Sequence, residues 1–267
     1  MSFQPIVLSG GFLGYQFLQR TLETQQAAFN ESTVNTRLTD YFEENIGSVT
    51  SAADLVADRR LLEVALGAFG LDDDINNKFF VEKILDDGVL SDDALSNRLA
   101  DKRYREFAKE FGFGDFSIPN TQLSTFADGI IEKFQTQRFE AAVGAQNDDM
   151  RLALNAGRAA EEIASGSTSA DGKWFEVMGN PPLRSVFETA LGLPGSFAQL
   201  DIDKQLEVFQ ERAEASFGDS GIEQFTDPEK QEDLVRLFLV RSQAATIAAT
   251  SAGSVALTLL QSSTLRF

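Results

Sequence analysis

The sequence predicts an all-α protein: a multi-helix, bundle-like fold built from two related halves, with a long C-terminal helix. Three observations support this fold class. Apolar residues recur mainly at intervals of three and four, which is the spacing of one helix face. A helix-and-turn phrase occurs twice, once early and once late in the chain. Alternating apolar and polar residues, which would indicate strands, are not persuasive anywhere, and only FQPIVL near the start could be extended.

The repeated phrase is the main reason to expect two halves. It is written DRRLLEVALGAFGLDDD at 58–74 and PLRSVFETALGLPGSF at 182–197. With an offset of 125 positions, Leu61 falls on Val186 and Gly67 falls on Gly192. An internal repeat of this kind indicates a duplicated supersecondary unit. We therefore expect a single all-α domain over residues 1–267, with repeat halves of roughly 1–120 and 121–267.

Stop and start signals surround both copies of the phrase. Gly70 is expected to end the first helix, and the Leu193-Pro194-Gly195 turn the second. Asp74 then precedes KFFVEKIL and Asp201 precedes KQLEVFQERA, so an acidic residue opens the next helix in each half. Further on, REFAKEFGFGDF at 105–116 is loosely echoed by RAEASFGDSGIEQF at 212–225. The expected pattern is helix, tight turn and Asp-capped helix, written twice.

Other helices are predicted from their spacing and caps. Phe126, Ile130 and Phe134 lie four apart and predict a long middle helix up to about residue 145. Residues 147–149, Asn-Asp-Asp, can cap the next helix, through MRLALNAGRAAEEIA. Asp227 followed by Pro228 is a strong start signal for the last helix.

The C-terminal segment carries a stripe with the 3.5-residue period of a coiled-coil seam. Arg241 and Gly253 weaken the stripe, and no charge follows Arg241 until Arg266. In so acidic a chain, a long uncharged stretch should be covered, either by the N-terminal helix of the same chain or by another chain. We expect this stripe to be the candidate partner-binding surface. Its members are Leu234, Phe238, Ala245, Ala248, Ala252, Val255 and Leu259.

Composition restricts the classes of function. Of 267 residues, 41 are acidic and 23 basic, for a net charge of −18, which disfavours binding to nucleic acid and to anionic lipid. The chain contains no Cys and no His, which excludes thiol and imidazole chemistry and Cys/His zinc sites. The start has no basic region typical of a secretory signal, and no span is apolar enough for membrane insertion.

Some motifs could form a reaction centre, but a structural role explains each of them better. SGGFLG at 9–14 lacks the glycine spacing of a dinucleotide loop. Asp72-Asp73-Asp74 resembles the start of a calcium loop, but Asn77 and Lys83 stand where Gly and a bidentate acid are needed. Paired acids recur along the chain, and solvated faces and helix caps explain them. We therefore expect no catalytic residue, no metal site and no cofactor.

Four phrases together resemble a bacterial family, the domain-of-unknown-function group numbered 1217. They are GGFLGYQFLQRT at 10–21, DLVADRRLLEVALGAFGL at 54–71, RLADKRYREFAKEFGF at 98–113 and FQTQRFEAAVGAQN at 134–147. The family is helical and its members are often encoded among flagellar genes. The resemblance implies a helical, non-enzymatic protein associated with the flagellum, and it assigns no catalytic residues.

We expect a structural or interaction protein associated with flagellar assembly or export, located in the cytoplasm or exported to the flagellum. Its expected partner is a flagellar component or a second copy of the chain. Two alternatives remain at this stage: an acidic adaptor or chaperone for a basic protein partner, and an enzyme with an Asp/Glu-lined site between the halves.

Overall fold

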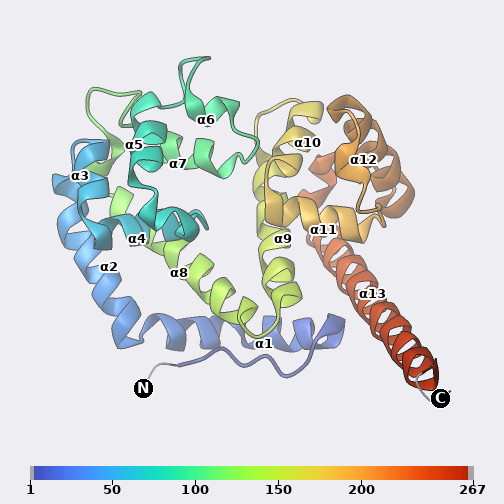
Figure 1. Ribbon diagram of the computed structural model, residues 1–267. Coiled ribbons are helices and arrows are strands. Elements are labelled where there is room, and N and C mark those ends of the chain that lie inside the picture. The colour runs from blue at the N-terminus through green and yellow to red at the C-terminus, as the bar shows by residue number, and fades with distance from the viewer. Residues whose placement is uncertain (1–2, 264–267) are drawn as a thin grey trace. The chain divides into compact units, whose positions relative to one another are not determined.

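The structure is a computed structural model that describes the backbone of residues 3–263 and the side chains of residues 3–248. Helices are the only regular elements over these residues, so the predicted all-α class is confirmed (Figure 1). The chain forms two compact units. The first contains residues up to Val7, Leu18–Asp148 and Met178–Pro181; the second contains Leu8–Phe17, Asp149–Val177 and the chain from Pro182 onward.

The α-helices that lie mainly in the first unit are α1 (Gly11–Asn30, from Leu18 on), α2 (Thr33–Asn45), α3 (Ala52–Ala57), α4 (Arg59–Gly67), α5 (Lys78–Asp87), α6 (Leu95–Arg98), α7 (Arg103–Phe111) and α8 (Phe126–Gly144). Short 3₁₀ turns join some of them: η1 (Ile46–Ser48), η2 (Asp72–Asn76) and η3 (Asn120–Gln122). The second unit contains the beginning of α1 and the helices α9 (Asp148–Ser165, from Asp149 on), α10 (Ala170–Met178, to Val177), α11 (Pro181–Ala190, from Pro182 on), α12 (Ile202–Phe217) and α13 (Pro228–Ser263), with 3₁₀ turns η4 (Phe197–Gln199) and η5 (Ile222–Thr226).

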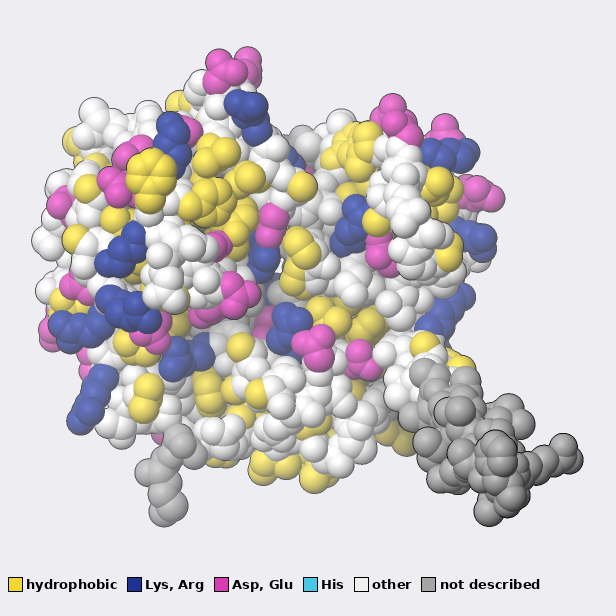
Figure 2. Space-filling model, in the orientation of Figure 1, with side chains coloured by type: hydrophobic (Ala, Val, Ile, Leu, Met, Phe, Trp, Pro, Cys, Tyr) yellow, Lys and Arg dark blue, Asp and Glu magenta, His cyan; other side chains and the backbone are white. Residues whose placement is uncertain are grey.

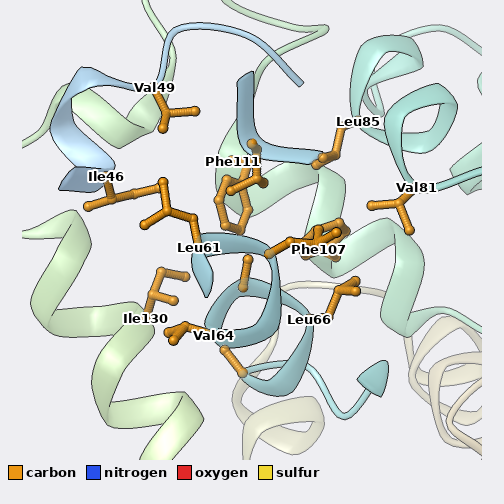
Figure 3. Close-up of a cluster of buried hydrophobic side chains, with 14 of the residues drawn as sticks. Ile46, Val49, Leu61, Val64, Leu66, Val81, Leu85, Phe107, Phe111 and Ile130 are labelled. Carbon is orange, nitrogen blue, oxygen red and sulfur yellow. The ribbon is translucent and has the colours of Figure 1, made fainter. Parts of the chain in front are cut away.

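A Phe-rich core holds the first unit together. Helix α4 lies at its centre and packs against α2, α3 and α8. Phe107 and Phe111 of α7 are buried beside Leu61 and Ile130, which come from α4 and α8 (Figure 3). The Phe107 and Phe111 ring centroids lie 5.0 Å apart, and aromatic pairs of this kind add to the free energy gained from burial.

The second unit has its own aromatic core around Trp174 of α10. This fully buried ring stacks on Phe209 of α12 and meets the edge of Phe187 of α11 at 5.5 Å. The indole N–H donates to the carbonyl of Ser220 at 2.9 Å, which satisfies its polar group. Phe225 of η5 closes the cluster against Phe187. Each unit therefore buries its large aromatic residues in a separate core.

Several of the predicted helix ends are confirmed. Helix α8 begins at Phe126 and buries one face at Ile130 and Phe134. Asp201 accepts the N–H of Asp203 at the start of α12, and Asp227 accepts the N–H of Glu229 at the start of α13. In the first half the predicted cap differs. Asn77 precedes α5, and Asp74 instead accepts the side-chain amide of Asn77 and the hydroxyl of Tyr104.

The two copies of the repeated phrase end in the same way, but in a different register from the one that the sequence predicts. Gly70 and Gly192 both adopt positive φ, +64° and +67°. The N–H of Leu71 bonds to the carbonyl of Leu66, and the N–H of Leu193 bonds to that of Glu188, a Schellman-type ending in both cases. Gly192, and not the turn at 193–195, therefore stops α11.

Gly192 thus corresponds structurally to Gly70, whereas the sequence alignment pairs it with Gly67. Gly67 is the last residue of α4 and adopts ordinary helical geometry. Gly70 and Gly192 lie 122 positions apart, whereas the sequence alignment has an offset of 125. The difference of three residues is close to one helical turn. The two offsets differ because the alignment matches similar side chains within the helices. The end of each helix depends instead on the backbone conformation of the glycine that follows it. The internal repeat itself stays a prediction. The two compact units divide mainly between Asp148 and Asp149.

Candidate interaction surface

The predicted seam of α13 divides into a buried part and an exposed part. Leu234 and Phe238 are buried in the second unit, with exposed fractions of 0% and 2%. Ala245 and Ala248 are exposed. The side chains of the remaining three seam residues, Ala252, Val255 and Leu259, lie outside the described residues.

The buried part of α13 belongs to the core of the second unit. Val235 and Leu239 are buried beside the first two seam residues, and this part of the helix packs against η5. Side chains at i, i+1, i+4 and i+5 share one helix face, so a single face of α13 is covered here. These residues stabilise the unit and are not available to a partner.

Arg241 interrupts the seam because it has a structural task. Its guanidinium donates to the carbonyl of Ala190, the last residue of α11. A cation at a helix C-terminus also interacts favourably with the helix dipole. Gly192 makes room for this contact, since a Cβ placed there would lie 2.8 Å from the guanidinium. In the first unit Arg103 donates to the carbonyl of Gly70, the positive-φ glycine after α4, and not to the last residue of the helix itself.

The C-terminal part of α13 extends away from α10, α11 and α12 (Figure 1), while Ser242 still donates its hydroxyl to Asp149 of α9. Every side chain from Gln243 to Ala248 is exposed, and none of them is charged. Val240 and Ile247 are exposed over 53% and 59% of their surface, and their spacing of seven places them on one face. This uncharged, exposed stretch is the part of the predicted seam that a partner could reach.

The start of α1 lies against the same stretch. A Cβ added to Gly11 would lie 2.9 Å from the side-chain oxygen of Gln243, and the φ of +73° at Gly11 also favours a glycine there. Close by in sequence, Leu8 and Leu13 are exposed over 67% and 79% of their surface. The start of α1 therefore approaches α13 at Gln243, and the side chains from 243 to 248 are exposed. Sequence reasoning anticipated this pairing but did not locate it at Gln243.

Acidic residues do not gather into a metal site over the described residues. The carboxylate of Asp74 accepts a hydrogen bond from the hydroxyl of Tyr104. Burial and this hydrogen bond raise the pKa of Tyr104. Asp115 accepts the N–H groups of Val89 and Leu90 and so holds a loop. On the face drawn in Figure 2, acidic and basic side chains are interspersed with hydrophobic ones over each unit.

Lys173, in the segment GSTSADGKW at 166–174, is buried and has a structural role. Lys173 donates to the carbonyl of Ala164 at 2.7 Å, near the end of α9, and forms an ion pair with Glu223 at 2.9 Å. The Lys173 ammonium holds the pKa of Glu223 below its ordinary value. The hydrogen bond satisfies an α9 carbonyl close to the helix C-terminus.

Comparison with known proteins places this all-α chain in a family. The family described as protein of unknown function (DUF1217) matches residues 68–231, more than half of the chain. The crystal structure of protein AGR_C_984 from Agrobacterium tumefaciens is similar, with 30% sequence identity and a TM-score of 0.71. The similarity covers 86% of this chain and 92% of that one. Among curated proteins, none matches the sequence.

The chain belongs to the DUF1217 family, as the four sequence phrases indicated. In the part of the chain that the structure describes, no helix has the length and apolar character needed to cross a membrane.

Proposed function

We propose that the protein is a non-enzymatic structural or interaction component, associated with bacterial flagellar assembly or export. It acts through the exposed stretch of α13 together with the start of α1. Its partner is a flagellar component or a second copy of the chain, and it works in the cytoplasm or after export to the flagellum.

The observation that carries this proposal is the change in α13 after Arg241. The helix continues, but its side chains at 243–248 are exposed and uncharged. A net charge of −18 makes two copies repel one another, and most acidic partners as well. An uncharged helix face avoids this repulsion, and small side chains such as Ala244 and Ala248 permit close approach of a second helix.

A matched pair of variants tests the surface. Ile247→Glu places a charge on the exposed stretch of α13, whereas Ala215→Glu places the same charge on an exposed position of α12. Both positions are exposed, so both variants are expected to fold. In a strain that lacks the gene, we expect poor swimming in soft agar that the native gene and Ala215→Glu restore, and that Ile247→Glu does not.

The outcomes separate the two parts of the proposal. Normal flagellation and swimming without the gene would contradict the flagellar association. Full rescue by Ile247→Glu would instead show that α13 is not the working surface. A chain that ends at Gln243 provides a second measurement: we expect it to keep the core of the second unit, since the side chains from 244 to 248 are exposed. If it unfolds while the intact chain has the solution mass of a monomer, the segment belongs to the core and the assembly role is wrong.

A further inference from the structure

The first unit contains a groove that the proposed function does not use. It has a volume of about 480 Å³, in the range of small-molecule sites, and it lies between α2, α8 and the turn η2. Phe29 and Phe134 contribute aromatic walls. The first described residues, Phe3 and Gln4, form one further side.

Small residues keep this groove open. Ala141 of α8 and Ala145, which directly follows that helix, line the groove, and both are exposed. At Gly67 a Cβ would lie only 2.8 Å from the ring of Phe134, so any larger residue there would push that ring. A larger side chain at any of these positions would fill or close the groove. The groove is therefore open because the sequence has small residues there.

Hydrogen bonds hold the N-terminal side of the groove in place. The side chain of Gln146 donates to the carbonyl of Pro5 at 2.6 Å. The N–H of Ile6 donates to the side-chain oxygen of Gln25, also at 2.6 Å, and Gln25 is buried. Phe3 and Gln4 directly precede these anchored residues, so this side of the groove is fixed at its C-terminal end.

The groove has one acidic and one basic lining residue, and they differ in how they are paired. The guanidinium of Arg138 forms an ion pair with Glu63 at 3.3 Å and lies 5.3 Å from the centre of the Phe134 ring. Asp72 has no ion-pair partner within 4.0 Å among the described residues. Partial desolvation of its carboxyl group raises the pKa of Asp72, although the residue as a whole is exposed. Its own backbone N–H and Arg138 oppose this rise, while Asp73 and Glu63 add to it.

We propose that this groove binds an organic cation, an ammonium or guanidinium group carried on an apolar body. The cation lies at Asp72 and the apolar body lies over Phe29 and Phe134, which line the groove and are themselves mostly buried. Asp72 is exposed at the edge of the groove and forms no ion pair among the described residues, so a cation bound there would compensate its charge. The aromatic walls bind apolar surface and also attract a cation. A free amine and a Lys or Arg side chain of a peptide share this chemistry.

A titration of the full-length, ¹⁵N-labelled chain with 4-phenylbutylammonium tests the site, followed by amide chemical shifts. The neutral alcohol 4-phenylbutanol and the anion 4-phenylbutyrate have similar apolar bodies and serve as probe controls. We expect the amine to shift amides around Ala141 and Ala145, and to bind about tenfold more tightly than the alcohol, because one charge pair adds this order of affinity. The anion should bind least well.

Two kinds of variant assign the binding to the groove. Asp72→Asn removes the carboxylate without changing its size and should lower the affinity for the amine to that for the alcohol. Asp73→Asn removes the same charge from an exposed neighbour that does not line the groove, and it should leave most of the affinity. Ala141→Leu fills the groove and should abolish binding of amine and alcohol alike.

The capped dipeptide acetyl-Phe-Arg-amide distinguishes the two sources of the cation. Tighter binding of the dipeptide than of the amine, with the same dependence on Asp72, indicates a protein partner; the reverse order indicates a small molecule. Equal binding of amine and alcohol, equal effects of Asp72→Asn and Asp73→Asn, or no shifts at about 10 mM of any cationic probe would overturn the proposal. The thermal midpoint of each variant verifies that it is folded. None of these outcomes bears on the role of α13.

Discussion

Substitution of Gly192 by Ala tests whether this residue, and not the turn after it, ends α11. Gly192 has φ +67°, a conformation that costs an alanine about 1 kcal/mol. A Cβ would also lie 2.8 Å from the guanidinium of Arg241, so the hydrogen bond from that group to Ala190 would be displaced. A hydrogen bond from a charged group contributes about 1.5–3 kcal/mol, and partial exposure of Arg241 favours the lower end. We expect Gly192→Ala to lower the free energy of unfolding by about 2–3 kcal/mol.

A double-mutant cycle separates the two contributions. In an Arg241→Ala background the displaced hydrogen bond is already absent, so Gly192→Ala should cost only about 1 kcal/mol, for the backbone conformation. The coupling between the two positions is then about 1–2 kcal/mol. Gly195→Ala is the control: a Cβ at Gly195 meets nothing within 4 Å and its φ is not positive, so this change should be nearly neutral.

Urea unfolding followed by Trp fluorescence is the appropriate assay. Trp174 is the single Trp of the chain and is buried in the second unit beside Phe187 of α11, so its emission reports the unfolding of that unit. A coupling energy near zero would show that Arg241 does not depend on the glycine. A larger cost for Gly195→Ala than for Gly192→Ala would show that the predicted turn at 193–195 ends the helix after all.

Further predictions concern one position in the first unit and one ion pair in the second. Gly67→Ala should destabilise the protein by about 1–3 kcal/mol, because the ring of buried Phe134 must move. Gly129→Ala should stabilise the protein by up to about 1 kcal/mol, because a Cβ at this position of α8 meets nothing within 4 Å. A calorimetric comparison that ranked the two variants the other way would refute the packing argument. Lys173→Met keeps the apolar stem but removes the bond to the α9 carbonyl, and should cost about 1–3 kcal/mol in urea unfolding. The lowered pKa of Glu223 means that its contribution is present above its ordinary value of 4.5 and is lost as pH falls through the lower folded value. Native protein should therefore lose more stability between pH 6 and about pH 3 than Lys173→Met does, and equal losses would show that the ion pair contributes nothing.

The repeated phrase shows where sequence reasoning reached its limit. It located two helices and a glycine stop in the first of them, because apolar spacing and glycine act locally. It aligned Gly67 with Gly192, since the letters ALG recur there. The structure pairs Gly192 with Gly70 instead, by positive φ and by the same backbone hydrogen bonds. The similar letters therefore located two helices, but they did not identify the residues that end them in the same way.

The candidate surface was predicted in the same partial way. The period of 3.5 predicted a seam along this helix, and the uncharged residues from 243 to 248 are exposed, while their use by a partner stays a prediction. Periodicity could not tell that Leu234 and Phe238 face the core of their own unit while Ala245 is exposed. A seam for a partner and a seam for a core have the same spacing. The groove at Asp72 gave no sequence signal, because its walls come from segments far apart in the chain.

The sequence by itself determined the helical class, the family, many of the helix starts and stops, and the apolar faces that must be covered. These properties follow from side-chain spacing and from backbone preferences of Gly, Pro and Asp, which act over a few neighbouring residues. Only the tertiary structure decided which face of α13 is buried, that Arg241 caps α11, and that Asp72 borders a groove lined by Phe134. These depend on contacts between residues distant in sequence, and no local pattern specifies which distant side chain fills a given space.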